Sequence, residues 1–581
     1  MTYIENYKKW LDNVSPEEKE ELLAFEGNET ELKERFSLPL AFGTAGMRGV
    51  LGLGTYRMNE YTVRRATQGL AEYVKSLGAE AMARGVVIAY DTRHKSFEFA
   101  FAAAKVLAHH HVNVFFFENV RPVPLCSFTI GHFKAIAGIM ITASHNPKEY
   151  NGYKVYGDDG AQMSPEATAE VVKLIEKADY FGIEEGEVEV ESKSYIHNLN
   201  GEKINPYITV IGKSVDEAYY RTLEKLSLSP EAVAAQGGKL KIVYTPLHGT
   251  GYVPVTTMFD RMKIPYSVVP EQAMPNGSFP TVKVPNPEMP DALTMGIALA
   301  EKIKGDVVIG TDPDADRMGV AVKDDSGKFV LLNGNQIGAL LMDYILKRHR
   351  QMGDLPINAA VVKTIVTTSL ARKIAESYGV ECFDVLTGFK FIGEKIKTWL
   401  ETGEHTFMFG YEESYGYLCG THAKDKDAVV SAMLFAEMVC FYKNNGVSVF
   451  QRLKRLFQKH GYFCEKSIAL TFPGLDGMKI MADKMDNLGK KNVTSLCGIE
   501  VERTDNYNTR ISTYRDGITK PITLPKSNVM YYALSSGDWV CARPSGTEPK
   551  LKFYVSACAS DQRSAEEKAN ALLEALKNEV N

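Results

Sequence analysis

Residues 306–317 read DVVIGTDPDADR. The apolar run 307–309 has the composition of a buried strand, and it leads into three aspartates at alternate positions, Asp312, Asp314 and Asp316. Carboxylates at this spacing repel one another and raise one another's pKa unless a hard cation holds them. We therefore predict that the three aspartates bind Mg²⁺ where a strand ends.

Other acidic motifs begin in a similar way. An EF-hand loop requires Gly at its sixth position and Glu at its twelfth, where this chain has Arg317 and Lys323. A phosphatase with an aspartyl-phosphate intermediate places its nucleophile after the first strand of its domain, whereas these aspartates follow a third strand. A solvated acidic turn is the remaining alternative, and the apolar strand before it argues against that interpretation.

The strand before the aspartates closes the second of three stretches that share one pattern. In each stretch three apolar runs alternate with helix-like segments, and the third run ends in a polar loop. The expected strands are 86–90, 112–117 and 137–141, then 240–244, 266–269 and 306–309, then 359–364, 380–385 and 406–409. This pattern predicts three βαβαβ units with parallel sheets. Because ligands bind beyond the carboxyl ends of parallel strands, the three polar loops indicate one shared site.

The pattern changes after an expected helix at 447–459. Strands are expected at 463–470, 528–533, 539–542 and 551–556, followed by a closing helix at 564–580. This order of elements indicates a fourth domain of α+β type. The predicted fold class is therefore α/β, with three consecutive βαβαβ-type domains that have mixed, mainly parallel sheets, and a C-terminal α+β domain.

Composition limits the partners and the compartment. The chain has 581 residues, a formal net charge of −5 and no basic block of the kind that follows nucleic acid. Its eight cysteines show no C-x-x-C spacing, which argues against a zinc site and a disulfide framework and indicates a reducing compartment. No segment resembles a signal peptide or a membrane span. We expect a cytoplasmic protein that binds small molecules and neither nucleic acid nor membrane.

The loop at 142–147 reads TASHNP and contains Ser144 and His145. Ser144 lacks the G-x-S-x-G elbow, so acyl transfer is weakly supported. A serine close to Mg²⁺ suits phosphate carriage, because phosphoserine holds roughly two negative charges that a cation and lysines neutralise. Lys154 would supply both positive charge and a proton. A helix N-cap is the alternative role for Ser144, and the residues alone leave both open.

The loop at 410–416 contains the adjacent residues Glu412 and Glu413. Adjacency argues against a glycosidase pair, whose carboxylates flank a bond from opposite sides. A carboxylate and the Ser414 hydroxyl are better suited to binding sugar hydroxyls. Three basic residues follow and form either a cationic rim or a solvated loop: His422, Lys424 and Lys426.

The segment 543–547, RPSGT, combines a guanidinium, two hydroxyls and a glycine that lets backbone N–H groups approach an anion. We interpret it as a phosphate site, with a surface turn as the alternative. The run 109–111 is three histidines, and we interpret it as a helix end and a strand start because consecutive strand residues alternate faces. Lys390 and His248 lie in glycine-containing loops, and their roles stay open.

Together these motifs resemble the α-D-phosphohexomutase family and, within it, the phosphoglucomutase/phosphopentomutase-like branch, from about residue 38 to the C-terminus. The resemblance implies that Ser144 is the phosphorylated residue and a further Mg²⁺ ligand. It also implies that the segment 43–49 is the family's N-terminal arginine segment. The catalytic residues that it implies are Ser144, His145, Lys154, Arg48 and Arg317. The substrate-binding residues that it implies are Thr44, Lys390, Glu412, Ser414, His422, Lys426, Arg543, Ser545, Gly546 and Thr547.

The implied activity is that of an intramolecular phosphotransferase of the isomerase class, a phosphoglucomutase that interconverts glucose 1-phosphate and glucose 6-phosphate. Its cofactors would be Mg²⁺ and glucose 1,6-bisphosphate, the bound intermediate. The metal loop has Pro313 and Ala315 where many members have glycines. The sugar loop reads EESYG instead of the EMSG of many bacterial phosphomannomutases, which favours glucose.

Several alternatives stay open under the same resemblance: a phosphopentomutase, a phosphomannomutase, a glucose 1,6-bisphosphate synthase or phosphatase, and a silent sugar-phosphate sensor. The expected assembly is a monomer or a homodimer. The expected domains are 1–205, a helical extension with the phosphoserine domain; 206–325, the metal-binding domain; 326–455, the sugar-binding domain; and 456–581, a phosphate-binding domain with a fold like that of the TATA-binding protein.

Overall fold

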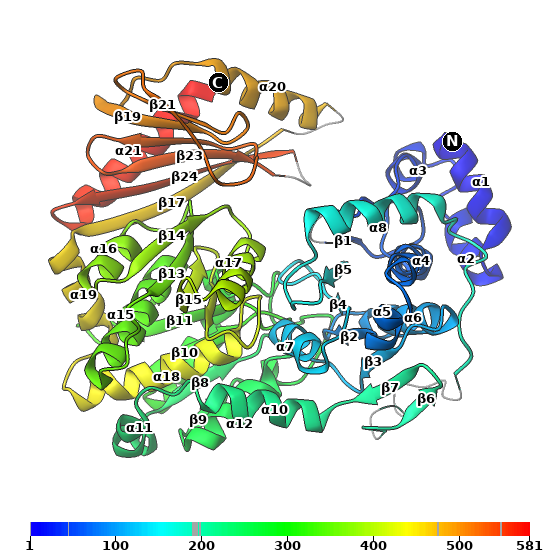
Figure 1. Cartoon of the computed structure of the whole chain (residues 1–581), viewed down its shortest axis with the longest axis horizontal. Helices are drawn as coiled ribbons and strands as arrows, with labels where there is room; N and C mark the ends of the chain where they lie inside the picture. Colours follow the sequence, from blue (N-terminus) through cyan, green and yellow to red (C-terminus); the bar gives the residue numbers. More distant parts are fainter. Residues whose placement is uncertain are drawn as a thin grey trace. The chain divides into compact units, whose positions relative to one another are not determined.

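The structure is a computed structural model that describes residues 2–43, 46–188, 196, 199–472, 476–545 and 549–580 (Figure 1). The chain forms two compact units. The first comprises Met1–Leu332, Gly393–Glu401 and Gly416–Asn444, and the second comprises Asn333–Ile392, Thr402–Tyr415 and Asn445–Asn581. None of the helices in the described ranges combines the length and apolar character needed to cross a membrane.

The first unit begins with three short helices, α1 (Tyr3–Asn13), α2 (Pro16–Leu23) and α3 (Glu29–Phe36). Capping boxes begin α1 and α2, where Thr2 and Ser15 each exchange hydrogen bonds with a glutamate three residues later. The helices close over the buried rings of Trp10 and Phe36, whose centroids lie 5.9 Å apart. The same cluster includes Tyr61 and Phe181, so it joins the N-terminal helices to the domain that follows.

A seven-stranded sheet follows, in the order β1-β5-β4-β2-β3-β7-β6. Strands β4, β2, β3 and β7 are parallel, whereas β1, β5 and β6 run antiparallel to their neighbours. Every residue of β2 and β4 is buried, as expected for parallel strands that are covered on both faces. The strands are β1 (Met47–Val50), β2 (Val86–Tyr90), β3 (Val114–Phe117), β4 (Ala137–Ile141), β5 (Tyr150–Tyr156), β6 (Lys203–Asn205) and β7 (Ile208–Ile211). The helices are α4 (Glu60–Ser76), α5 (Ala79–Arg84), α6 (Ser96–His109), α7 (Val123–Phe133) and α8 (Pro165–Lys177).

The second sheet of this unit has the order β12-β11-β10-β8-β9. Strands β8, β9 and β10 are parallel, and β11 returns antiparallel beside β10. The strands are β8 (Ile242–Thr245), β9 (Tyr266–Val268), β10 (Val307–Thr311), β11 (Met318–Lys323) and β12 (Phe329–Leu332), and β16 (Gly416–Cys419) belongs to the same unit. The helical segments are α10 (Lys213–Glu224), α11 (Pro230–Gln236), η1 (Gly237–Lys239), α12 (Tyr252–Met262), α13 (Pro270–Ala273), α14 (Pro290–Ile303) and α18 (Ala428–Asn444).

In the second unit, β14 (Glu381–Val385), β13 (Ala359–Thr364) and β15 (Thr406–Glu412) lie side by side and parallel. Helices α15 (Gly334–Met352), α16 (Leu370–Ser377) and α19 (Val449–His460) belong to this unit, and α17 (Lys390–Thr402) begins in it. Asn333 begins α15 with a capping box that includes Gln336.

The C-terminal sheet of the second unit has the order β17-β24-β23-β22-β19-β20-β21 and is antiparallel throughout (Figure 1). Met485 of α20 and Leu572 of α21 belong to the core that these helices share with the sheet. The strands are β17 (Tyr462–Thr471), β18 (Ser495–Leu496), β19 (Ile499–Asn506), β20 (Ile511–Tyr514), β21 (Thr519–Pro521), β22 (Met530–Leu534), β23 (Trp539–Pro544) and β24 (Lys550–Ala559), with helices α20 (Gly477–Lys490) and α21 (Gln562–Val580).

The α/β class predicted from the sequence is confirmed, and the sheets are mixed. In the first unit, β4 and β10, each the third strand predicted in its stretch, are both followed by an antiparallel strand, β5 and β11. The polar loops of the sequence are therefore hairpin turns between strands. The sequence analysis did not predict β5, because its residues, YNGYKVY, mix polar groups and a glycine with aromatic residues.

Candidate active site

The three aspartates lie in the turn between β10 and β11. Ala315, at the centre of the turn, has a φ of 48°, and its N–H donates to the Asp312 carbonyl at 3.0 Å. Asp312, Asp314 and Asp316 are buried, and a ligand atom from each lies within 4.8 Å of the others. The described part of the chain contains no other group of three acidic, His or Cys residues that meets this geometry.

Backbone and lysine donors partly neutralise this cluster. Asp312 Oδ1 accepts from the N–H groups of Asp316 and Arg317, each at 3.1 Å. Lys154 Nζ donates to Asp314 Oδ2 at 2.9 Å, and Lys426 Nζ lies 3.3 Å from Asp316 Oδ2. The positive charge that faces the aspartates therefore comes from two different strands or loops of the first unit.

The surroundings shift the pKa values of Asp312 and Asp316 in opposite directions. Burial, together with the carboxylates of Asp314 and Asp316, raises the pKa of Asp312 well above its usual value. Burial also acts to raise the pKa of Asp316, but the ammonium groups of Lys426 and Lys154 outweigh it, and the pKa is lowered. The cluster is thus an arrangement of carboxylates that an added cation would stabilise.

The hydrogen bonding of two carboxylate oxygens in this cluster indicates whether a metal ion fits there. Asp314 Oδ1 and Asp316 Oδ1 are buried and have no hydrogen-bond partner among the described residues. A buried carboxylate oxygen without a partner is costly, and hard divalent cations such as Mg²⁺ prefer carboxylate ligands. The residues therefore fit a Mg²⁺ ion, which would be held by Asp312, Asp314 and Asp316.

Ser144 lies in the turn between β4 and β5 with a φ of 52°. Its N–H donates to Thr142 Oγ1 at 2.8 Å, and its hydroxyl donates to Asp312 Oδ2 at 3.1 Å. His145 Nδ1 lies 3.0 Å from the same hydroxyl. No helix begins in the described residues between α7 and α8, so the helix N-cap alternative for Ser144 is wrong.

Lys154 lies on β5, with its ammonium buried against Asp314 and, at 3.6 Å, Asp316. Burial acts to lower the pKa of Lys154, but the two carboxylates outweigh it and raise the pKa. Lys154 is therefore an ammonium, which can donate a proton.

Lys426 is anchored by its neighbour Asp425. Asp425 Oδ1 accepts from Lys426 Nζ at 2.9 Å, and Asp425 Oδ2 accepts from the Tyr156 hydroxyl at 3.0 Å. Lys424 and Lys426 are both buried, so the alternative of a solvated loop is wrong for these two lysines.

The side chain of His422 is buried beside Asp427 and is not open to a substrate. Its Nε2 lies 2.7 Å from Asp427 Oδ2, which also accepts from the Tyr219 hydroxyl at 2.8 Å. The side chain of His422 is only 2% exposed. Asp427 in turn accepts from the first N–H groups of α18, so His422 contributes to the start of this helix. A substrate-binding role for His422 stays a prediction.

The two predicted catalytic arginines lie beside the turns that carry Ser144 and the aspartates. Arg48, on β1, donates from Nη1 to Asn146 Oδ1 at 3.0 Å, beside the Ser144 turn. Arg317 follows the last aspartate and pairs with Glu288. The predicted substrate residue Thr44 lies outside the described residues.

The second unit holds the predicted sugar-binding residues. Glu412 is the last residue of β15 and is buried, and Ser414 lies in the turn that follows. Glu413 Oε2 accepts from Thr364 Oγ1 at 3.0 Å and from Thr367 Oγ1 at 3.2 Å. Of the two adjacent glutamates, Glu413 therefore binds the threonine hydroxyls at and after the end of β13. Lys390 is the first residue of α17, and its ammonium lies over the Phe391 ring.

The predicted phosphate segment begins on a strand and not in a loop. Arg543 and Pro544 are the last two residues of β23, and Arg543 pairs with Lys552 of β24. The Ser545 N–H donates to the Lys550 carbonyl at 2.7 Å, which extends the pairing of the two chain segments by one residue. Gly546 and Thr547 lie outside the described residues.

Sequence reasoning missed two residues that hold this site in place, Arg93 and Asp425. Arg93 follows β2, and its guanidinium donates to the carbonyl of Ser144 at 2.6 Å. The rule that polar residues at the ends of parallel strands face one site applies to Arg93 as well, and could have found it. Asp425 carries no comparable signal, because its role depends on Tyr156 of a distant strand.

Comparison with known proteins covers most of the chain. The family models for phosphoglucomutase/phosphomannomutase α/β/α domains I, II and III match residues 39–181, 217–327 and 333–460. A phosphoglucomutase of Staphylococcus epidermidis is 38% identical over 92% of this chain and 93% of its own length. One from Staphylococcus saprophyticus is 35% identical over 94% of this chain and 95% of its own length.

Solved structures share the fold. A phosphoglucomutase (parafusin) from Paramecium, in an open form, covers 93% of this chain and 94% of its own with a TM-score of 0.68 at 16% identity. A putative phosphomannomutase from Thermus thermophilus covers 93% of this chain and 99% of its own with a TM-score of 0.67 at 23% identity. The domain matches and the identity to curated phosphoglucomutases show that this chain belongs to the phosphoglucomutase/phosphomannomutase family of α-D-phosphohexomutases, enzymes of the isomerase class.

Proposed function

We propose that this enzyme interconverts glucose 1-phosphate and glucose 6-phosphate through a phosphoserine at Ser144 and a bound glucose 1,6-bisphosphate. The observation that carries the proposal is the 3.1 Å contact of Ser144 Oγ with Asp312 Oδ2, inside a buried cluster of three carboxylates. A phosphate on this hydroxyl would lie beside the atoms that fit a divalent cation. The name phosphoglucomutase of the curated relatives supports glucose as the sugar.

Asp312, Asp314 and Asp316 would hold Mg²⁺, and when bound the ion supplies positive charge that withdraws electrons from the phosphoryl group. The chain's own cations complete the neutralisation. Lys154 and Lys426 already face the aspartates, and Arg48 lies beside the Ser144 turn. Because phosphoryl transfer depends on positioning and charge, these side chains would supply much of the lowering of the barrier.

The bond changes follow from the two chemical forms of Ser144. The P–O bond to Ser144 Oγ breaks as a sugar hydroxyl oxygen bonds to phosphorus. Lys154, whose pKa the carboxylates raise, gives a proton to Ser144 Oγ, and the proton lost by the sugar hydroxyl replaces it. His145, 3.0 Å from Ser144 Oγ, is the second candidate for moving this proton. The bisphosphate then turns end for end, and its other phosphoryl group returns to Ser144.

Further substrate-binding roles are proposed for residues of the second unit. We assign the sugar hydroxyls to Glu412 and Ser414, supported by the commitment of Glu413 to Thr364 and Thr367. The distant phosphate would be bound by a guanidinium and hydroxyls at the end of β23. The residues proposed for this phosphate are Arg543, Ser545, Gly546 and Thr547, and those proposed for further substrate contacts are Thr44, Lys390, His422 and Lys426.

We also propose the four domains 1–205, 206–325, 326–455 and 456–581, a cytoplasmic location, and a monomer or homodimer as the active form. The phosphopentomutase and phosphomannomutase activities, and glucose 1,6-bisphosphate synthesis, remain the alternatives on the same scaffold. The sugar is the least constrained part of the proposal, because epimers differ only in hydroxyl positions.

The experiment is a substrate panel with the purified chain, Mg²⁺ and a trace of glucose 1,6-bisphosphate. Glucose 1-phosphate, mannose 1-phosphate, ribose 1-phosphate and deoxyribose 1-phosphate are each supplied, and the position of the phosphate is followed by ³¹P NMR. We expect the fastest turnover with glucose 1-phosphate, a mass increase of about 80 Da on Ser144, and loss of both in Ser144→Ala. Full activity in Ser144→Ala, or no conversion of any sugar phosphate, would overturn the proposal.

A further inference from the structure

The guanidinium of Arg93 gathers the backbone of the Ser144 turn. Its Nη2 donates to the carbonyls of Ser144 and Asn146 at 2.6 and 2.5 Å. Its Nη1 donates to the carbonyls of Pro147 and Tyr150 at 2.8 and 3.1 Å. One side chain at the end of β2 thus binds four carbonyls in the connection between β4 and β5.

The end of β2 also fixes the direction of this side chain. Asp91 Oδ2 lies 3.3 Å from Arg93 Nε, and neither side chain is exposed. Asp91 Oδ1 accepts from the Arg93 N–H at 2.9 Å and from the Ser96 hydroxyl at 2.6 Å. The Arg93 N–H and the Ser96 hydroxyl therefore fix the Asp91 carboxylate. This carboxylate in turn orients the Arg93 guanidinium towards the Ser144 turn.

The ring of Phe279 also packs on this guanidinium, with its centroid 5.0 Å from Arg93 Cζ. The segment that carries Phe279 contacts the end of β2 a second time, where Ser278 Oγ lies 2.8 Å from His94 Nε2. Gly277 is required here, because a Cβ would lie 2.5 Å from the His94 nitrogen. Arg93 is therefore enclosed by the Ser144 turn, Asp91 and an aromatic ring.

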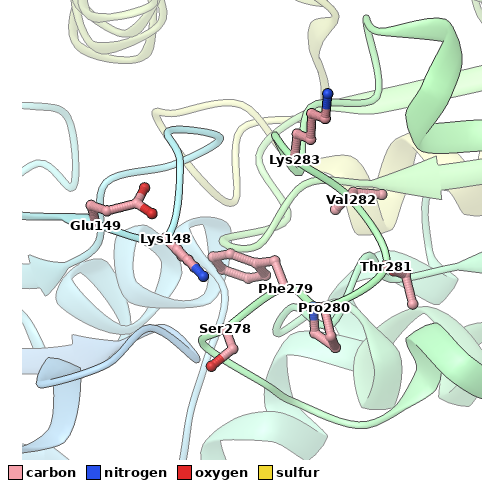
Figure 2. Close-up of a pocket in the computed structure, with 8 residues that line it drawn as sticks. All are labelled: Lys148, Glu149, Ser278, Phe279, Pro280, Thr281, Val282 and Lys283. Atoms are coloured by element: carbon pink, nitrogen blue, oxygen red, sulfur yellow. The ribbon is translucent and has the colours of Figure 1, made fainter.

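Phe279 separates this arrangement from the surface. It lines a pocket of about 480 Å³ together with Lys148 and Glu149, which follow the Ser144 turn (Figure 2). Phe279 is itself buried, so the ring shields the guanidinium from the pocket.

The geometry explains why the position is an arginine. Four carbonyls that converge on one point need several donors in a plane, and a guanidinium provides five N–H groups in a fixed fork. A lysine offers three donors around a single nitrogen and does not span four oxygens in this way. Ser144 also has a left-handed backbone, with a φ of 52°, which a non-glycine residue adopts only when its surroundings hold it there.

We propose that Arg93 is a positioning residue for phosphoryl transfer. It fixes the backbone of the Ser144 turn so that the Ser144 hydroxyl, with or without its phosphate, faces the aspartate cluster. Arg93 has no contact with substrate in this role, because the carbonyls, Asp91 and Phe279 surround its guanidinium. The inference rests on the proposed function of Ser144.

The test compares Arg93→Lys and Arg93→Ala with the wild type and with Arg84→Ala. Arg84 is a matched control, because it also donates to backbone carbonyls, those of Lys134 and Ala135. We expect Arg93→Lys to lower kcat at least about 100-fold with KM for glucose 1-phosphate within about threefold, since a small misplacement of a reacting group has a cost of this size. The mass adduct on Ser144 should form more slowly by a similar factor, and Arg84→Ala should keep its kcat.

Chemical rescue separates positioning from general damage to the fold. Arg93→Ala leaves a space of the shape of the missing guanidinium, so free guanidinium, at concentrations far below those that unfold the protein, should restore part of kcat. Ammonium at the same concentration should not, because it lacks the planar fork. If Arg93→Ala fails to fold, the kinetics of Arg93→Lys decide the question.

Two results would overturn the inference: a kcat of Arg93→Lys within about threefold of the wild type, or a loss that appears mainly in KM. These outcomes differ from a failure of the proposed function, in which the wild type itself converts no sugar phosphate. If the wild type accepts a different sugar phosphate, the same variants are measured with that substrate. If the wild type acquires no phosphate on Ser144, the inference falls with the proposed function.

Discussion

Ser144 Oγ lies 3.1 Å from Asp312 Oδ2, although 168 positions of sequence separate the two residues. Each follows a buried parallel strand, β4 for Ser144 and β10 for Asp312, and each lies in the turn that leads to an antiparallel strand. The repeated topology thus brings the same local feature of two sheets together. One repeat supplies a hydroxyl and the other supplies carboxylates, and the proposed phosphoryl transfer depends on this pair.

Metal binding should depend on Asp314, whereas an aspartate outside the cluster should not affect it. Asp314 Oδ1 is buried and has no hydrogen-bond partner among the described residues, so it is available as a metal ligand. Asp314→Asn removes the negative charge of this ligand. We expect the affinity for Mg²⁺, measured by calorimetry, or for Mn²⁺, measured by EPR, to fall at least about tenfold. Asp324→Asn is the control, because Asp324 caps the exposed turn after β11 and should leave the affinity unchanged. Equal affinities of the wild type and Asp314→Asn would place the metal elsewhere.

The metal loop should also depend on Gly249. A Cβ at this position would lie 2.5 Å from Pro313 Cα, and the next residue, Thr250, donates its N–H to the Pro313 carbonyl at 2.8 Å. We expect Gly249→Ala to push the aspartate turn away, with a loss of stability of about 1–3 kcal/mol and weaker metal binding. Gly131→Ala is the control, because a Cβ added there would meet no described atom within 4 Å outside the nearby helix backbone, and alanine is favoured in helix α7. Unchanged stability in Gly249→Ala would mean that the turn shifts freely.

Much of the fold could be predicted where burial on both faces leaves a continuous apolar run. The strands β2, β4 and β13 have the predicted bounds, because each is apolar nearly throughout and is buried. Strand β5 was not predicted, since Asn151 and Gly152 interrupt its apolar residues. It is a strand because β4 pairs with it on one side and β1 on the other, a context that local sequence does not reveal.

The same distinction applies to the site. Asp312 and Ser144 could be found from local sequence, because a reactive group directly after a buried strand is a local pattern. The same rule could assign Arg93 to the site, but its contacts with the Ser144 turn could not be predicted, since the carbonyls that it binds lie more than 50 positions later. His422 has a contact that its basic neighbours do not indicate, because its imidazole pairs with Asp427.

The two adjacent glutamates of the sugar loop should behave differently. Glu413 Oε2 already accepts from Thr364 and Thr367, so Glu413→Gln keeps an acceptor oxygen and should change KM less than about threefold. Glu412→Gln should raise KM for glucose 1-phosphate about tenfold or more, because a carboxylate accepts sugar hydroxyls more strongly than an amide. Steady-state kinetics on both variants is the measurement. A larger change in Glu413→Gln would reverse the assignment.

His248 should make the stability of the first unit depend on pH. Its Nε2 lies 2.9 Å from the Thr281 hydroxyl and its Nδ1 lies 3.3 Å from the Met274 carbonyl, and burial lowers the pKa of the imidazole. The folded chain therefore binds fewer protons than the unfolded chain below about pH 6.5, the ordinary pKa of histidine, and stability falls as the pH decreases through that value.

The measurement is Tm between pH 7.5 and pH 5.5 for the wild type, His248→Gln and His132→Gln. Glutamine can donate to the Met274 carbonyl and accept from Thr281 without titrating, so His248→Gln should lose less Tm over this range than the wild type. His132 is exposed on the last turn of α7, and His132→Gln should follow the wild type. If His248→Gln and the wild type lose the same Tm, the acid sensitivity arises from groups other than His248.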